Sequence, residues 1–124
     1  MCRIIAINGK IQQPLLLELL SQFGKLAESG KVRRGTTPGH KDGWGLAGYE
    51  DGIISLREKE VASAARSSKF MTAINVLSAT SPDFVVGHLR KASVGKNSIE
   101  NTQPYWLGNL TFCNNGTVNN FKNI

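Results

Sequence analysis

An apolar, β-branched run begins at the third residue of this chain and constrains the fold more than any other feature. Residues 3–8 read RIIAIN, and the run ends at Asn8 and Gly9. Short runs of this kind, closed by turn-forming residues, are typical of β-strands. The N-terminus is therefore predicted to be built into a sheet from its first residues.

The rest of the chain predicts helices and further strands. The predicted elements are a helix at 14–29, a hairpin of 44–49 and 53–56, a helix at 62–77, a strand at 84–89, a polar loop at 91–104 and a strand at 110–113. Asp51 and Gly52 give a strong turn signal for the hairpin. The second helix is expected to break near Ser67 and Ser68, and residues 119–124 are expected to begin a further element. This order predicts an α+β fold in which helices pack on mainly antiparallel strands.

Length, charge and cysteine content limit the classes of protein to consider. The 124 residues correspond to one domain, and no apolar run approaches the ~20 residues of a membrane span. The chain shows no secretory signal and has only two cysteines, so a cytoplasmic protein is expected. The formal net charge is +6, but the basic residues are spread out and no nucleic-acid-binding motif accompanies them. No nucleic-acid partner is therefore expected.

One motif suggests a nucleotide site but lacks the required context. Residues 43–48 (GWGLAG) match the G-x-G-x-x-G pattern of dinucleotide-binding proteins. That pattern needs a following helix whose N-terminal amides face the phosphates, whereas here a hairpin follows. These glycines are instead expected to allow close backbone approach or a bulge in a strand.

Potential metal ligands are present, but none are paired at the short spacings of structural zinc sites. They are Cys2, His40, Asp42, His88 and Cys113. No metal is therefore predicted. His88 is expected in the core or near a site, and His40 is expected to be an exposed loop side chain.

Cys2 is the most informative single residue. One interpretation is a small buried residue at the head of a strand, which is common for free cysteines. In the other, an aminopeptidase removes Met1, and Cys2 then carries a thiol and a free α-amine on one carbon. An α-amine has a pKa near ~8, so it can accept the thiol proton and activate the nucleophile. Position alone leaves both interpretations open.

Five segments in order carry a further pattern. They are MCRIIAI at the N-terminus, HKDGWGLAGY at 40–49, GHLRKASVG at 87–95, NTQPYW at 101–106 and FCNNGTV at 112–118. In these segments the chain resembles the glutaminase domain of class-II glutamine amidotransferases, a branch of the N-terminal nucleophile hydrolases, and is most similar to small stand-alone proteins with the DGWG signature. The resemblance implies one glutaminase-like domain over residues 1–124, with an αββα four-layer sandwich that is incomplete at the C-terminus. It also implies cleavage of the γ-amide of glutamine through a thioester on Cys2, without a metal or organic cofactor.

The resemblance further implies roles for individual residues. Asn115 and Gly116 match the pair that stabilises the oxyanion, and Arg90 matches the residue that holds the substrate's α-carboxylate. Ser93 stands near the position of an assisting hydroxyl. The other residues expected to line or support the site are Trp44, Gly45 and His88. Without the resemblance, Arg90 is interpreted as a solvated charge, and the Asn-Gly pair as a tight turn.

The chain departs from the family pattern at two histidines and at its C-terminus. Asn114 stands where a histidine usually precedes Asn-Gly, and Gln103 stands where the N-x-H-P motif has histidine. The family domain continues past Ile124, and the acidic residue for the α-amine of glutamine is expected beyond it. Two alternatives stay open: a γ-glutamyl amide or peptide hydrolase, and a non-catalytic remnant that acts as a binding or assembly module. The partners considered are a small-molecule substrate, a second copy of the chain and a synthase, and no membrane partner is expected.

Overall fold

The computed structural model describes residues 1–120 and has an α+β fold. Its elements are β1 (Arg3–Asn8), α1 (Gln13–Ser29), β2 (Gly43–Glu50), β3 (Ile53–Glu60), the 3-10 helix η1 (Ala64–Arg66), α2 (Ser68–Thr80), β4 (Phe84–Arg90), β5 (Tyr105–Leu107) and β6 (Leu110–Phe112). Every helix and strand predicted within residues 1–120 is present, and β1 has the predicted bounds. β5 is an addition to the prediction. Residues 121–124, where a further element is predicted to begin, lie outside the described residues.

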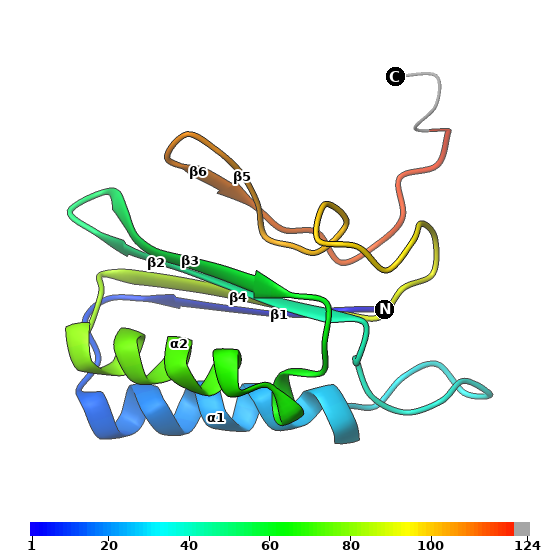
Figure 1. The fold of residues 1–124 in the computed structure, drawn as a ribbon, viewed down its shortest axis with the longest axis horizontal. Coiled ribbons are helices and arrows are strands. Elements are labelled where there is room, and N and C mark those ends of the chain that lie inside the picture. Colours follow the sequence, from blue (N-terminus) through cyan, green and yellow to red (C-terminus); the bar gives the residue numbers. More distant parts are fainter. Residues whose placement is uncertain (121–124) are drawn as a thin grey trace.

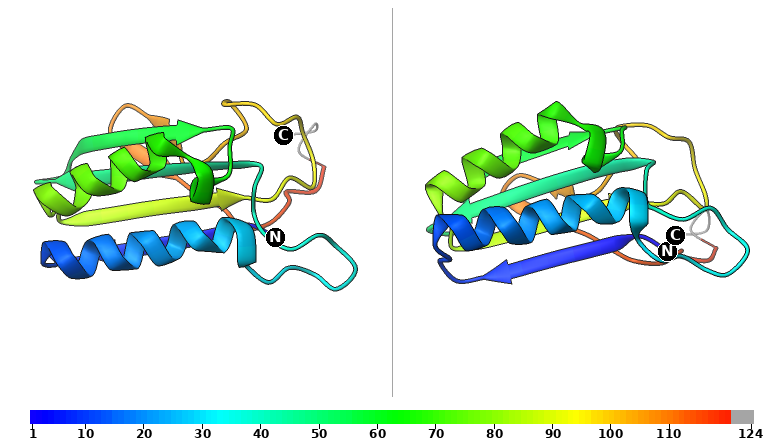
Figure 2. Two further views of the ribbon diagram at one scale, coloured as in Figure 1. Left: turned by 60° about the horizontal axis from the view of Figure 1, so that its bottom comes forward. Right: turned by 90° about the horizontal axis from the view of Figure 1, so that it is seen from below.

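The strands β1, β4, β2 and β3 form one antiparallel sheet in that order. Both helices lie against one face of this sheet (Figure 1, Figure 2). The turn between β2 and β3 has positive φ angles at Asp51 (50°) and Gly52 (75°), as the predicted tight turn requires. The register shifts between Gly48 and Tyr49, so the glycine-rich segment contains an irregularity of the predicted kind.

The hydrophobic core lies between the sheet and the helices. The helices contribute Leu16, Leu20, Phe23, Phe70, Ala73, Ile74 and Leu77, and the sheet contributes Trp44, Leu46, Val85 and Leu89. Trp44 packs edge to face on Phe70, with 5.1 Å between ring centroids. Because successive residues of a strand point to opposite faces, the alternate residues of these strands point away from the helices. We call that side of the sheet the outer face.

The second predicted helix is divided at Ser67, near the predicted break. Ser67 Oγ accepts a hydrogen bond from Phe70 N at 2.9 Å and caps the N-terminus of α2. The same hydroxyl donates to Glu60 of β3, which also accepts a hydrogen bond from Trp44 Nε1 at 3.2 Å. The cap therefore ties the start of α2 to the sheet.

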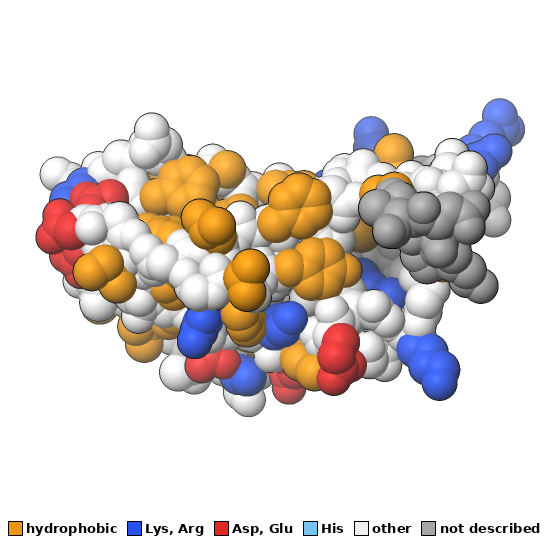
Figure 3. Space-filling model, turned by 90° about the horizontal axis from the view of Figure 1, so that it is seen from above, with side chains coloured by type: hydrophobic (Ala, Val, Ile, Leu, Met, Phe, Trp, Pro, Cys, Tyr) orange, Lys and Arg blue, Asp and Glu red, His pale blue; other side chains and the backbone are white. Residues whose placement is uncertain are grey.

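The short hairpin of β5 and β6 lies on the outer face (Figure 1). Tyr49 Oη lies 3.1 Å from Asn109 O, and Lys59 Nζ lies 4.4 Å from the centre of the Trp106 ring. Apolar side chains gather on this side of the molecule (Figure 3). The hairpin exposes Leu107, Leu110 and Phe112. Within residues 1–120, no helix combines the length and the apolar character needed to cross a bilayer.

Candidate active site

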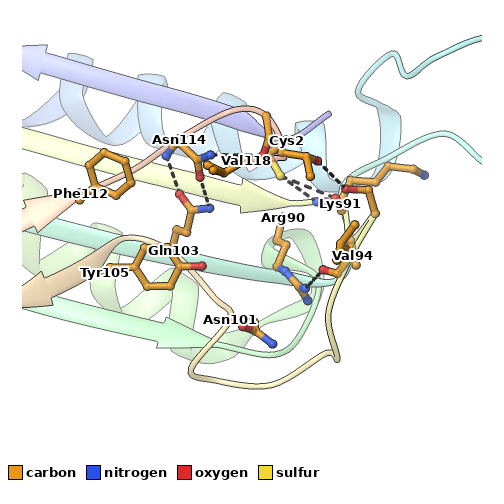
Figure 4. Close-up of a pocket in the computed structure, with 14 residues that line it drawn as sticks. Cys2, Arg90, Lys91, Val94, Asn101, Gln103, Tyr105, Phe112, Asn114 and Val118 are labelled. Atoms are coloured by element: carbon orange, nitrogen blue, oxygen red, sulfur yellow. Dashed lines mark hydrogen bonds between the residues drawn. The ribbon is translucent and has the colours of Figure 1, made fainter. Parts of the chain in front are cut away.

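Cys2 lies at the end of the sheet where β1 begins and β4 ends, and Figure 4 shows it beside Lys91 and Arg90. It stands one residue before the first β1–β4 pair, so the antiparallel register places it opposite Arg90. Lys91 N donates to Cys2 Sγ at 3.4 Å, and Sγ lies 3.7 Å from Lys91 O. The backbone nitrogen of Cys2 donates to Asn115 Oδ1 at 2.9 Å. Segments from both ends of the chain therefore meet at Cys2.

Arg90, the last residue of β4, is a buried cation with only 5% of its surface exposed. Its Nη1 donates to Asn97 Oδ1 at 2.7 Å and its Nη2 to Val94 O at 3.4 Å, and both acceptors are neutral. No carboxylate within residues 1–120 forms an ion pair with it. Buried charges in proteins are normally paired, so this guanidinium suits an anionic ligand. Its burial excludes the interpretation as a solvated surface charge.

Asp42 and Asn97 hold the Arg90 side chain in place, a role not predicted from the sequence. Asn97 Nδ2 donates to Asp42 Oδ1 at 3.3 Å. Asp42 Oδ2 accepts from Ala92 N at 2.8 Å, and Asp42 N donates to Arg90 O at 3.1 Å. The available signal was the aspartate in HKDGWGLAGY, but its link to Arg90 depends on the pairing of β2 with β4.

The segment 114–116 lies beside Cys2 on the outer face. Gln103 Nε2 donates to Asn114 Oδ1 at 2.8 Å, and Asn114 N donates to Gln103 Oε1 at 2.6 Å. Asn114 Nδ2 donates to Gly116 O at 3.2 Å. Asn115 and Gly116 are exposed, and Asn115 reaches Cys2 through its side-chain oxygen. The structure therefore brings the predicted oxyanion pair to the predicted nucleophile.

A cavity of about 290 Å³ is lined by most of these residues, although not by Asn115 (Figure 4). Its lining includes Cys2, Arg90, Ser93, Gln103, Asn114 and Gly116. Small-molecule sites commonly measure about 300–1,000 Å³, so this cavity is of a size for a ligand like an amino acid. A second cavity, of about 420 Å³, shares Cys2 with the first and is lined also by Met1, Val32 and Arg33.

The other predicted site residues differ in their relation to the first cavity. Ser93 lines it, with Oγ 3.5 Å from Thr117 Oγ1. Trp44 lies in the core between the sheet and the helices, on the opposite face of β2 from Gly45. The expectation that Trp44 lines the site is therefore corrected. Gly45 faces outward without lining the cavity. An added Cβ there would overlap the Gln103 carbonyl, so this glycine permits a close backbone approach of the predicted kind.

His88 is fully buried and also does not line the cavity. Neither of its ring nitrogens has a hydrogen-bond partner within residues 1–120. Burial lowers the pKa of His88 to about 4, and the proximity of the Asn114 backbone opposes this shift only in part. His88 is therefore a neutral imidazole at neutral pH, placed beneath the site as a supporting group.

His40 is buried as well, so the expectation of an exposed loop side chain is wrong. The loop that follows α1 folds back onto the end of the helix, where His40 N donates to Ala27 O at 2.8 Å. The ring nitrogen Nδ1 lies 3.2 Å from Leu26 O. Burial lowers the pKa of His40 from its ordinary value. The helix end is thus closed by a histidine from the loop.

The unfolding free energy is expected to fall as the pH decreases from 6.5 to 4. In this window the unfolded chain binds a proton at His88 that the folded chain does not, because burial lowers the folded-state pKa to about 4. The loss amounts to about 3 kcal/mol at the acid end, and above about pH 7.5 His88 contributes almost no pH dependence. Urea denaturation at pH 7.5 and 4.5 measures the change, with His88→Gln as the comparison. His40 lowers the unfolding free energy of both proteins on acidification, so the variant is expected to lose less than the original protein but not nothing. Equal losses in the two proteins would contradict the assignment to His88.

Cys113 is a second free thiol, but it differs from Cys2 in its surroundings. Burial raises the pKa of Cys113 to about 11. The thiolate is the reactive form of cysteine, so Cys113 is a poor nucleophile at neutral pH. Within residues 1–120, no three potential metal ligands form a cluster.

Comparison with known proteins relates this geometry to a family. A sequence model of the family described as "Glutamine amidotransferases class-II" matches residues 1–124. The whole chain is 28% identical to a Haemophilus influenzae protein named "Putative glutamine amidotransferase", of which it covers 40%, and 26% identical to the Escherichia coli "Putative glutamine amidotransferase YafJ", of which it covers 46%. It is also 27% identical to the isomerizing glutamine–fructose-6-phosphate aminotransferase of Caulobacter vibrioides, of which it covers 18%. The chain therefore spans less than half the length of these relatives. With the family match over all 124 residues, the chain belongs to the class-II glutamine amidotransferases.

Proposed function

We propose that this protein hydrolyses the γ-amide of glutamine through a γ-glutamyl thioester on Cys2. The observation that carries the proposal is the buried Arg90 guanidinium, which has no carboxylate partner within residues 1–120 and lines the same cavity as Cys2. A guanidinium binds a carboxylate through two parallel hydrogen bonds, so Arg90 suits the α-carboxylate of a glutamyl group. With that end held, the γ-carboxamide extends toward the sulfur.

The proposed chemistry requires removal of Met1. While Met1 is attached, the Cys2 nitrogen is an amide that donates to Asn115 Oδ1, and an amide nitrogen is not a base. The freed amine has an ordinary pKa near ~8 and accepts the thiol proton. The sulfur attacks the carbonyl carbon of the γ-carboxamide, the amine passes the proton to the leaving nitrogen, and the carbon–nitrogen bond breaks to release ammonia and leave the thioester. Water then hydrolyses the thioester and releases glutamate.

Both steps place negative charge on the former amide oxygen. We assign its stabilisation to the Asn115 side-chain amide and the Gly116 N–H, which lie in the segment beside Cys2. Preorganised donors of this kind supply a large part of the rate enhancement in acyl transfer. Fixing the segment 114–116 therefore matters for the reaction as well as for the fold.

We also propose the αββα four-layer sandwich as the architecture of the whole domain. The helices and the four-stranded sheet correspond to two of these layers. The β5–β6 hairpin on the outer face supports a second sheet layer there. The exposed apolar side chains of this hairpin support further packing on the same side.

Incubation of the intact protein with glutamine tests the proposed function. After mass analysis of the N-terminus, protein that begins at Cys2 is expected to release ammonia and glutamate in equal amounts, and protein that retains Met1 is expected to be inactive. γ-Glutamyl peptides are assayed in parallel, because Arg90 would hold their glutamyl half in the same way. Cleavage of the peptides alone would support a γ-glutamyl peptide hydrolase. No turnover of either substrate by correctly processed, folded protein would contradict the proposal and leave a binding module.

A further inference from the structure

The two positions at which the sequence departs from the expected histidine pattern contact each other. Gln103 and Asn114 are 11 residues apart, and they form two hydrogen bonds of 2.8 and 2.6 Å. The Gln103 amide group donates to the Asn114 side chain and accepts from the Asn114 backbone. Both residues line the cavity that contains Cys2 (Figure 4). The two departures are therefore one structural unit.

Gln103 is a firm anchor for this unit. Only 8% of its surface is exposed, and its backbone lies directly over Gly45 of β2. The preceding residue, Thr102, is fully buried, and its carbonyl accepts a hydrogen bond from Lys59 Nζ at 2.9 Å. Thr102 Oγ1 also donates to Ser98 O at 2.8 Å. The Gln103 side chain is thus presented from a segment that is fixed on the sheet.

Asn114 connects Gln103 by hydrogen bonds to the residues that lie beside the Cys2 sulfur. Its Nδ2 donates to Gly116 O at 3.2 Å, so one side chain connects Gln103 to both ends of the segment 114–116. Asn115, between these ends, accepts the hydrogen bond from Cys2 N. Displacement of a reacting or stabilising group by about 1 Å can cost as much as 10²-fold in rate. Asn115 and Gly116 form an exposed bend and not the tight turn considered from the sequence, so this segment needs such a restraint to aim its donors.

We propose that Gln103 and Asn114 are a matched positioning pair that holds Asn115 and Gly116 against Cys2, at the positions where the resemblance leads us to expect histidines. The pair acts on the reaction through these neighbours and does not touch the reacting atoms. This inference rests on the proposed function. It implies that the segment 114–116 is held in place without the two histidines expected from the resemblance.

A double-mutant cycle tests the pairing by activity. Gln103→Ala and Asn114→Ala are each expected to lower kcat for glutamine about tenfold with little change in KM, because Arg90 is untouched. The double variant is expected to lose about tenfold as well, since either change already breaks the unit. Independent effects that multiply to about a hundredfold loss would overturn the proposal, as would unchanged kcat in folded variants. Gln22→Ala, on the exposed face of α1, is the matched control.

Introducing the two expected histidines gives a second arm that does not depend on the alanine variants folding. Gln103→His and Asn114→His are each expected to lose about tenfold in kcat, because each leaves an unmatched partner. The variant with both histidines is expected to recover to within about threefold of the original protein. A double variant no better than the worse single one would count against a matched pair.

Hydrogen exchange separates failure of this inference from failure of the proposed function. The Asn114 N–H is held by Gln103 Oε1, so Gln103→Ala is expected to speed its exchange by about tenfold or more. Gln22→Ala is expected to leave this rate unchanged. If the original protein shows no turnover, the proposed function fails while the exchange result still decides whether the pair holds the segment. An unchanged Asn114 exchange rate in Gln103→Ala would refute the pairing.

Discussion

Cys2→Ala is expected to abolish both glutamine hydrolysis and covalent labelling by an electrophilic glutamine analogue. Removing the nucleophile of an acyl-transfer enzyme typically costs about 10⁴-fold or more in kcat, which leaves only the contribution of binding and the oxyanion donors. The thiol lies opposite Arg90 in one cavity, so an analogue held by its carboxylate presents its reactive carbon to sulfur. Intact-mass spectrometry measures the adduct, and an ammonia assay measures turnover.

The second cysteine provides the matched control for this experiment. Cys113→Ala is expected to label and turn over like the original protein, because burial raises the pKa of the Cys113 thiol to about 11. Protein that retains Met1 is expected to label far more slowly than protein that begins at Cys2. An adduct that persists in Cys2→Ala, or that disappears in Cys113→Ala, would place the reactive thiol elsewhere.

Asn115→Asp is expected to lower kcat about 10² to 10³-fold, as much as Asn115→Ala does. In the structure Asn115 Oδ1 accepts a hydrogen bond from Cys2 N, while its Nδ2 makes no hydrogen bond within residues 1–120. The free amide nitrogen is the group assigned to the oxyanion, and loss of one such donor costs about 10² to 10³ in rate. Aspartate keeps an oxygen for the Cys2 nitrogen but has no donor, and its charge repels the oxyanion.

Steady-state kinetics on glutamine separates the two functions of this side chain. We expect KM to change by less than about threefold in both variants, because Arg90 still holds the substrate. If Asn115→Asp kept most of the activity while Asn115→Ala lost it, holding the Cys2 nitrogen would be the important role. In that case the oxyanion would be stabilised by the Gly116 N–H and by a donor other than Asn115.

The sequence predicts the sheet and the helices well because local signals and tertiary packing agree there. The run at 3–8 is closed by Asn8 and Gly9, and β1 has these bounds. The break predicted near Ser67 is a capped helix start, because serine satisfies a free N–H of the first turn. β3 extends past its predicted end to Glu60, where charged residues continue the ladder without an apolar signal.

The features missed by sequence reasoning depend on contacts between distant segments. β5 has only three residues and directly follows a polar loop, so no periodicity marks it. The burial of His40 results from the loop folding back on α1, which no local pattern encodes. The Gln103–Asn114 pair joins two segments on either side of the hairpin, and each residue alone looks like the loss of a histidine. At the site, the motifs led to Cys2 and Arg90. The residues that hold Arg90 emerge only from the structure, Asp42 through the pairing of β2 with β4 and Asn97 through the fold of the loop after β4.

The position of Cys2 ahead of β1 also has a practical consequence for recombinant work. Met1 already lines a cavity that includes Cys2, so little separates the sulfur from anything fused upstream. An affinity tag that stays attached there would keep the Cys2 nitrogen acylated and crowd this cavity. Under the proposed mechanism, a preparation that keeps such a tag would show no turnover, so a purification tag belongs at another position of the chain.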